Sequence, residues 1–98
     1  SYRTDFHKIG RAMRAARVAE SMAKDQNISP GPILMATYLH EMTVDDAREL
    51  LEKVKAPEPI VEKVLELIRD ISLPQRPQST ELDIICEARR QAERSAEN

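Results

Sequence analysis

The chain has 98 residues, of which 15 are Lys or Arg and 17 are Asp or Glu, so its formal net charge is −2. Domains dedicated to nucleic-acid binding are usually strongly basic, and this balance argues against one. Apolar residues make up 41% of the chain and aromatic residues only 3%, which is typical of a helical protein. We therefore expect one all-α domain, a compact five-helix bundle that covers residues 1–98.

The cysteine content and the hydropathy pattern indicate the expected compartment. Cys86 is the only cysteine of the sequence, so no disulfide forms within the chain and no cysteine-rich zinc site is expected. The sequence has no signal-peptide pattern and no apolar run long enough to cross a membrane. We therefore expect a cytoplasmic protein without a membrane partner, and Cys86 as a small core residue.

Five stretches of the sequence predict helices, at about 4–24, 30–41, 44–55, 58–71 and 80–95. In the first, the apolar side chains fall within about 140° of arc and predict one buried face: Phe6, Ile9, Ala12, Met13, Ala16, Ala19 and Ala23. In the third, the spacing predicts a buried face made of Val44, Ala47, Leu50, Leu51 and Val54. Thr43 is expected to cap the third helix, and Ser79 or Thr80 the fifth.

The second predicted helix is the most apolar one and is expected at the centre of the bundle. Ser29 and Pro30 are typical of a helix start, and residues 33–39 are apolar at nearly every position. A helix without a polar face is normally buried on all sides. This helix ends in the polar pair His40 and Glu41, where we expect any chemistry of the protein to lie.

Several segments resemble motifs of the HD phosphohydrolase superfamily, especially of its small bacterial members. The helix that ends in Leu39-His40-Glu41 resembles the Ala-Ala-x-Leu-His-Asp helix of that family. The segment from Pro57 to Val64 resembles the lead into the family's next helix. The segment from Glu81 to Arg90 resembles the last motif helix, which carries an Ala-Asp step in active members. The first helix, with Arg11 and Arg14, resembles the segment that follows the first metal-binding histidine. This likeness implies an HD-like fold for most of the chain.

The resemblance also implies a metal centre of the type His, His-Asp and Asp, which activates water for phosphoester hydrolysis. His40 matches the family's second histidine, and Glu41 stands where the family has Asp. Lys8 stands at the first histidine, with His7 one position away, and the final Asp position holds Arg89. A guanidinium cannot coordinate a cation. We therefore expect no working metal site and no cofactor, with His40 and Glu41 as vestigial catalytic candidates.

Two further expectations concern charged side chains. Arg89 is expected to fill the place of the metal and to form an ion pair with Glu41. Four basic residues follow the first helix at three-residue intervals, and they form either a possible anion-binding face or a solvated one: Lys8, Arg11, Arg14 and Arg17. No aromatic side chain is interleaved with them for base stacking, so nucleic acid is not an expected partner.

Together these features favour a non-catalytic, degenerate HD-like domain, a pseudoenzyme that acts as a protein-interaction or dimerisation module. A homodimer or a protein partner is expected, because a small bundle buries elsewhere the apolar faces that it cannot cover itself. One alternative is a metal-dependent phosphohydrolase for nucleotides or phosphomonoesters, with a divalent metal held by His7, His40 and Glu41. A second alternative is an anion- or nucleotide-binding sensor that uses the basic face of the first helix.

Overall fold

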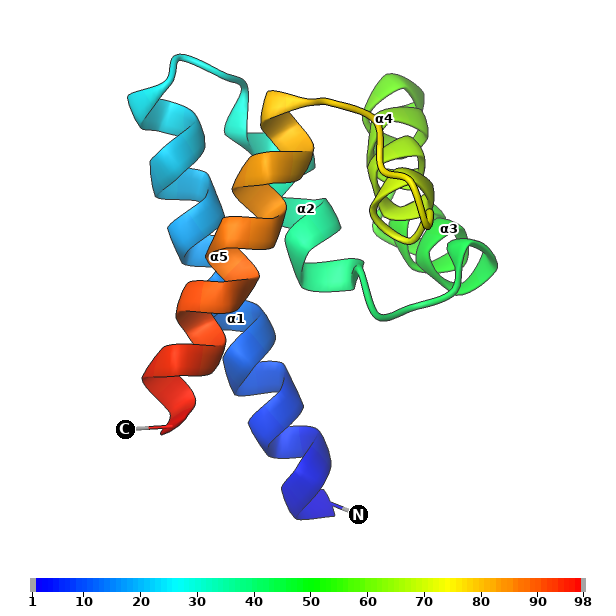
Figure 1. The fold of residues 1–98 in the computed structure, drawn as a ribbon. Coiled ribbons are helices and arrows are strands. Elements are labelled where there is room, and N and C mark those ends of the chain that lie inside the picture. Colours follow the sequence, from blue (N-terminus) through cyan, green and yellow to red (C-terminus); the bar gives the residue numbers. More distant parts are fainter. Residues whose placement is uncertain (1, 98) are drawn as a thin grey trace.

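The computed structural model describes residues 2–97, and the side chains of residues 6–94. Its five α-helices are α1 (Tyr2–Asp25), α2 (Pro30–Leu39), α3 (Val44–Lys53), α4 (Glu58–Ile71) and α5 (Thr80–Glu97). Within residues 2–97 the chain forms no strand. The expected all-α bundle of five helices is therefore confirmed (Figure 1).

The helix ends follow from local hydrogen bonding. α2 ends at Leu39, two residues earlier than expected, and the amide of Met42 donates to the Leu39 carbonyl at 2.9 Å. Thr43 then caps α3 as predicted, because its hydroxyl oxygen accepts from the Asp46 amide at 3.1 Å. Ser79 caps α5 in the same way, with its hydroxyl oxygen 3.3 Å from the Leu82 amide. Glu41 consequently lies in a turn outside the helix.

α2 is the helix around which the others are arranged. α1 and α5 lie side by side, and α2 packs against both of them and against α4 (Figure 1). α3 packs chiefly against α4. A salt bridge of 2.8 Å between Lys63 of α4 and Glu81 of α5 joins the two sides of the bundle. The predicted central place of α2 is thus confirmed.

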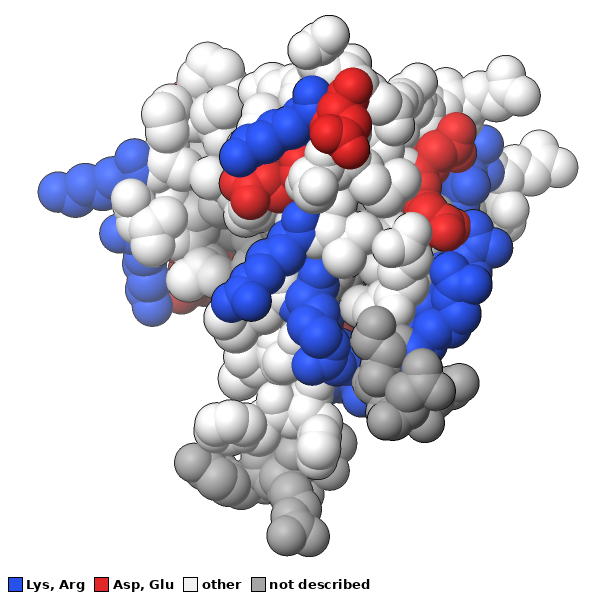
Figure 2. Space-filling view, turned by 90° about the vertical axis from the view of Figure 1, so that its left-hand side faces the viewer, with Lys and Arg blue, Asp and Glu red and all other residues white. Residues whose placement is uncertain are grey.

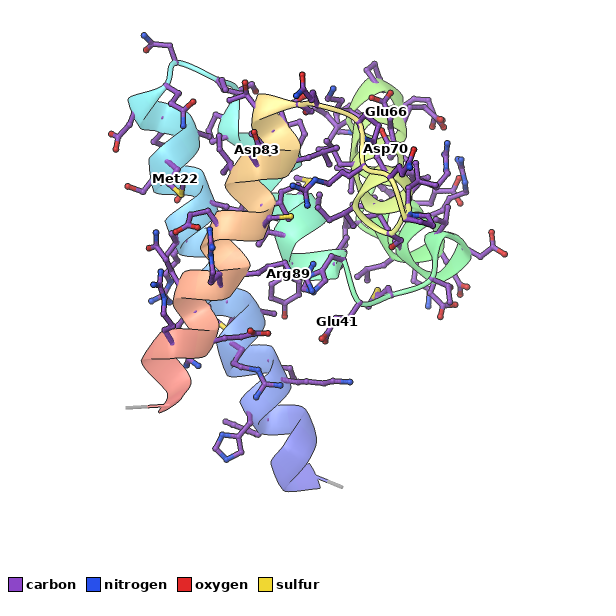
Figure 3. All side chains as sticks on the ribbon, in the orientation of Figure 1. Met22, Glu41, Glu66, Asp70, Asp83 and Arg89 are labelled. Carbon is purple, nitrogen blue, oxygen red and sulfur yellow. The ribbon has the colours of Figure 1, made fainter. Side chains whose placement is uncertain are left out.

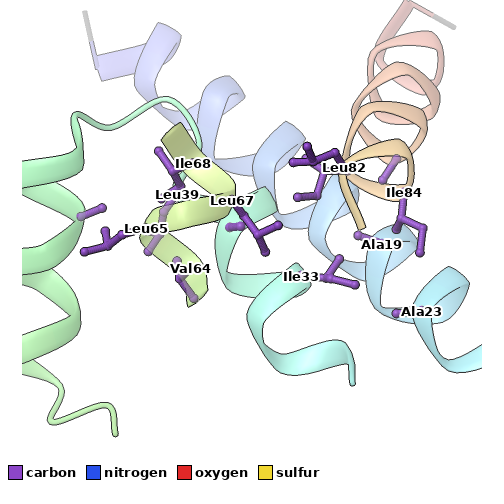
Figure 4. Packing of buried hydrophobic residues seen from close by; sticks show 14 of the residues in the cluster. Ala19, Ala23, Ile33, Leu39, Val64, Leu65, Leu67, Ile68, Leu82 and Ile84 are labelled. Carbon is purple, nitrogen blue, oxygen red and sulfur yellow. The ribbon is translucent and has the colours of Figure 1, made fainter. Parts of the chain in front are cut away.

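The core is built from branched aliphatic side chains of α2, α4 and α5 and from alanines of α1 (Figure 4). Ile33, Leu65 and Leu82 are among its largest fully buried members. Thr37 is buried among them, and its hydroxyl donates to the Ile33 carbonyl at 2.7 Å, so this polar group is satisfied within its own helix. Alanines such as Ala19 allow α1 to approach α2 and α5 closely.

Several side chains that the spacing placed in the core are exposed instead. Phe6 is 66% exposed, and Ile9 and Met13 are also exposed, so the predicted buried face of the first helix is wrong over its first half. The reason is length: 24 residues of helix rise about 36 Å, whereas the ten residues of α2 rise about 15 Å. The N-terminal half of α1 therefore extends past the end of α2 (Figure 1).

A similar correction applies to α3. Ala47 and Leu51 are buried as predicted, but Leu50 is only partly covered and Val54 is 66% exposed. Val54 lies just past the end of the helix, and Lys55 follows with a positive φ of 59° that turns the chain away. One helix, α4, covers α3, so its buried stripe is narrower than the spacing predicts.

No helix within residues 2–97 is both long enough and apolar enough to span a membrane.

Candidate functional site

A small pocket lies where the end of α2 meets α1 and α5, and it holds about 40 Å³ of free space. Its wall is formed by Lys8, Arg11, Ala12 and Ala15 of α1, by His40 and Glu41 after α2, and by Arg89, Ala92 and Glu93 of α5. The three alanines are short, so they leave room between longer charged side chains. The pocket gathers charged groups from three separate segments of the chain.

His40 forms one side of this pocket and is half-buried. Its Nδ1 lies 2.7 Å from the carbonyl oxygen of Thr37 and donates to it, because a carbonyl can only accept. Burial lowers the pKa of His40 below its usual value, and the charge of Arg89 acts in the same direction. The bond to Thr37 and the carboxylates of Glu41 and Glu93 act in the opposite direction. The ring is therefore neutral at pH 7.

Glu41 and Arg89 face the same pocket but do not form the ion pair that the sequence predicts. Arg89 comes from α5 and Glu41 from the turn after α2 (Figure 3). Among the side chains of residues 6–94, no nitrogen of Arg89 lies within 4.0 Å of a carboxylate oxygen. α2 ends before Glu41, so its carboxylate does not follow the helical direction that the prediction assumed. The predicted pair is thus wrong, although the predicted proximity to one site is correct.

The basic residues of the pocket have no ionic partner among the described side chains. Lys8 and Arg11 of α1, like Arg89, are absent from every ion pair within residues 6–94. The pocket therefore brings together three basic groups and two carboxylates, with a neutral imidazole beside them. Its net charge is about +1.

The remaining predicted site residues lie elsewhere. His7 is exposed on α1 and does not line the pocket, so the predicted ligands His7, His40 and Glu41 are not brought to one site. Nowhere among the described residues do three or more His, Cys, Asp or Glu side chains gather closely enough to hold a metal ion. Arg14 and Arg17 are exposed and also lie outside the pocket, so the predicted basic face divides into two parts.

Basic side chains are nevertheless prominent on the face formed by α1 and α5 (Figure 2). Arg90 and Arg94 of α5 are both paired with Glu87. Arg14 and Arg17 of α1 form no ion pair with the side chains of residues 6–94. This outer face is consistent with an ordinary solvated helix surface, while the pocket residues Lys8 and Arg11 are set into a concave site.

An apolar groove adjoins the pocket. It has a volume of about 370 Å³ and runs between the N-terminal half of α1, the end of α2 and α3. Its apolar walls are Ile9, Tyr38, Met42 and Leu50, whose exposures range from 36% to 49%. Lys8, Ala12 and Glu41 line both the groove and the pocket. We call these two connected hollows the docking groove and the charged pocket.

The sequence prediction missed most of the docking groove and one of the charged residues of the charged pocket, Glu93. Tyr38 and Leu50 were predicted to be buried, but they are 41% and 36% exposed. Glu93 follows Arg89 by four residues and so lies on the same face of α5. Once Arg89 is predicted to line the site, this spacing is enough to predict Glu93 there as well. The groove depends on how far α1 extends past α2, which short-range spacing does not indicate.

Cys86 is half-buried on α5, so the predicted core position is only partly correct. A guanidinium nitrogen of Arg76, from the segment before α5, lies 2.8 Å from its sulfur and donates to it. Arg76 is also paired with Asp83, at 3.6 Å. The thiol therefore takes part in holding the segment between α4 and α5 against the start of α5.

Comparison with protein-family models, with curated protein sequences and with solved structures gave no significant match.

Proposed function

We propose that the chain is a non-catalytic, degenerate HD-like domain that binds a protein partner through the docking groove. The observation that carries this proposal is the groove itself, with four large apolar side chains exposed side by side. Contiguous apolar surface on a small domain is typical of a protein-interaction site. A groove bounded by helices suits the apolar face of a partner helix.

The charged pocket supports the HD-like part of the proposal. Lys8, His40, Glu41 and Arg89 are the four residues that the resemblance aligned with metal-ligand positions, and they come from three distant segments. Chance similarity of short helical motifs gives no reason for them to line one pocket. The replacement of two ligand positions by Lys8 and Arg89 supports a domain without metal chemistry, since cations repel a metal ion. A cytoplasmic location belongs to the same proposal.

A partner of different sequence suits the groove better than a second copy of the chain. In a two-fold symmetric pair each copy presents the same patch, so each of the two interacting surfaces would contain one charged pocket. Each has a net charge of about +1 from Lys8, Arg11 and Arg89 against two carboxylates, and like charges across an interface are unfavourable. The homodimer predicted from the sequence remains the competing occupant.

Two matched substitutions on α3 test the proposal. Leu50→Glu places a charge in the groove, whereas Val54→Glu places one on the same side of the molecule but outside the groove lining. Peptides selected from a random phage-displayed library on the immobilised chain should bind the Val54→Glu variant as well as the unmodified chain. Their binding to Leu50→Glu should fall at least tenfold, because a carboxylate cannot be buried in the groove without a partner.

Failure to enrich any peptide, or equal binding to both variants, would contradict the proposal. Light scattering on the protein as it elutes from a size-exclusion column distinguishes a partner of different sequence from a second copy of the chain. A mass of one chain, 11.2 kDa, is expected for the protein alone. A doubled mass that Leu50→Glu returns to a single chain would assign the groove to a second copy.

The phosphohydrolase alternative requires a bound divalent metal, and metal analysis of the purified protein tests it. Under the proposal, added manganese leaves both the metal content and the melting temperature unchanged. About one ion per chain, lost in the His40→Ala variant, would favour the enzyme instead.

A further inference from the structure

The docking groove and the charged pocket form one continuous recognition surface. Lys8, Ala12 and Glu41 line both hollows, so the groove and the pocket adjoin one another along these three residues. The groove offers apolar contact from Tyr38 and Leu50, while the pocket offers charge. A partner that fills both must itself combine these two properties.

The pocket has one positive charge in excess. Three basic side chains face two carboxylates, and His40 stays neutral. No ion pair within residues 6–94 includes Lys8, Arg11 or Arg89, so their hydrogen-bond donors are available to a ligand. One singly charged anion neutralises this excess. A doubly or triply charged phosphate group would bring more negative charge than the excess of one, and the surplus would be repelled by the carboxylates of Glu41 and Glu93.

The size of the pocket points to the same kind of ligand. Its free space of about 40 Å³ corresponds to about three water molecules, since each needs ~10–15 Å³ on the same measure. A carboxylate head group on a side chain that enters from the groove fits such a space.

We propose that the partner segment is both apolar and acidic, with apolar side chains in the docking groove and one carboxylate in the charged pocket against Arg11 and Arg89. This inference rests on the proposed function, because it needs a protein segment in the groove. It adds the chemical class of that segment. Arg11 comes from α1 and Arg89 from α5, so two helices each contribute a guanidinium group to the lining of the pocket.

The test begins with the composition of peptides that a random library yields on the unmodified chain. Enriched sequences should share Asp or Glu at a fixed spacing from their apolar residues. One such peptide is then synthesised with its acidic residue and with the matching amide, and both are titrated by isothermal calorimetry. The acidic peptide should bind about ten- to a hundredfold more tightly, because hydrogen bonds to a charged partner are the stronger ones.

Substitutions in the protein assign that preference to the pocket. Arg89→Gln and Arg11→Gln should each bring the acidic peptide close to the affinity of its amide form and leave the amide form unchanged. Arg14→Gln is the matched control, since Arg14 shares α1 with Arg11 and does not line the pocket. It should preserve the preference. Circular dichroism checks that each pocket variant is folded. If one of the two variants is misfolded, the other still shows whether the acidic preference depends on the pocket.

The outcomes separate this inference from the proposed function. Apolar peptides that bind the groove without any acidic preference would overturn the inference and leave the proposed function standing. An equal loss in Arg14→Gln and Arg11→Gln would also overturn it, because a diffuse charge effect would then explain the preference. Failure to enrich any peptide would overturn both.

Discussion

At the scale of single residues, His40 is a titratable side chain that the fold removes in part from water. It is half-buried, donates to the Thr37 carbonyl and faces Arg89 across a small pocket. Burial is the main reason that its pKa is lowered. The folded protein therefore holds a neutral ring under conditions in which the unfolded chain already binds a proton.

This difference predicts how stability depends on pH. As the pH falls below 6.5, the unfolded chain gains a proton at His40 that the folded chain does not take up, so the free energy of unfolding decreases. The loss continues until the pH reaches the lower pKa of the folded state. In the His40→Gln variant this part of the pH dependence should disappear. Urea unfolding at pH 7.5 and 5.5 measures it.

The matched control for this experiment is His7→Gln. It removes an exposed histidine of α1 and keeps His40, so its stability should still fall toward pH 5.5. If His40→Gln and the unmodified chain lose the same stability between the two pH values, the interpretation of His40 is wrong.

At the scale of elements, α1 and α3 end in the same local backbone conformation. Asn27 and Lys55 have positive φ values of 58° and 59°, just past the last helical turn. In both, the next amide bonds back across the turn, from Ile28 to the Ala23 carbonyl and from Ala56 to the Leu51 carbonyl. Asparagine tolerates this left-handed conformation, whereas a lysine is strained in it.

The strain at Lys55 predicts a stabilising substitution. Lys55→Gly should raise the free energy of unfolding by about 0.5–1 kcal/mol, because glycine adopts the left-handed conformation without steric cost. Part of the gain is offset by the greater freedom of glycine in the unfolded chain. Lys53→Gly, two residues earlier and inside α3, should instead lower stability by up to about 1 kcal/mol. Thermal unfolding of the two variants should show opposite shifts, and a loss in both would contradict the argument.

Short-range sequence patterns predict where the helices start better than where they end. Helix starts at Pro30, Val44, Glu58 and Thr80 agree with the predicted boundaries, because capping residues and prolines are local signals. The ends of α2 and α3 come two residues early, since turn hydrogen bonds and the left-handed Lys55 decide them. No periodic pattern contains that information.

The site was predictable only in part for a related reason. The resemblance singled out Lys8, His40, Glu41 and Arg89, and these residues do share one pocket. The predicted ion pair fails because α2 ends before Glu41, and His7 lies outside the pocket because one residue along α1 rotates a side chain by about 100°. The docking groove depends on the relative lengths of α1 and α2, which only the assembled bundle determines.

At the scale of the whole molecule, the helices differ in how many neighbours hold them. α2 packs against α1, α4 and α5, whereas α3 packs chiefly against α4 (Figure 1). Only Ala47 and Leu51 of α3 are buried. Its ion pairs, such as Arg48 with Glu62 at 3.2 Å, are exposed and contribute little. α3 should therefore open more easily than the rest of the bundle.

Hydrogen exchange followed by mass spectrometry tests this difference. After correction for intrinsic rates, amides of α3 should exchange sooner than those in the last two turns of α2, which open only when the bundle unfolds. The docking groove has one wall on α3, at Leu50, so a bound peptide should slow exchange in α3. Equal protection of α2 and α3 in the free protein would contradict this interpretation.

The alanines between α1 and its neighbours have a consequence for how such a sequence can drift during evolution. Ala19, Ala23 and Ala88 have no exposed surface, and they belong to α1 and α5, which pack against one another. A larger side chain there separates the helices, while glycine weakens the helix itself, so these positions accept almost no change. The walls of the docking groove carry no such restriction. Under the proposed function, the residues of the groove can therefore change, and with them the partner, while the framework stays the same.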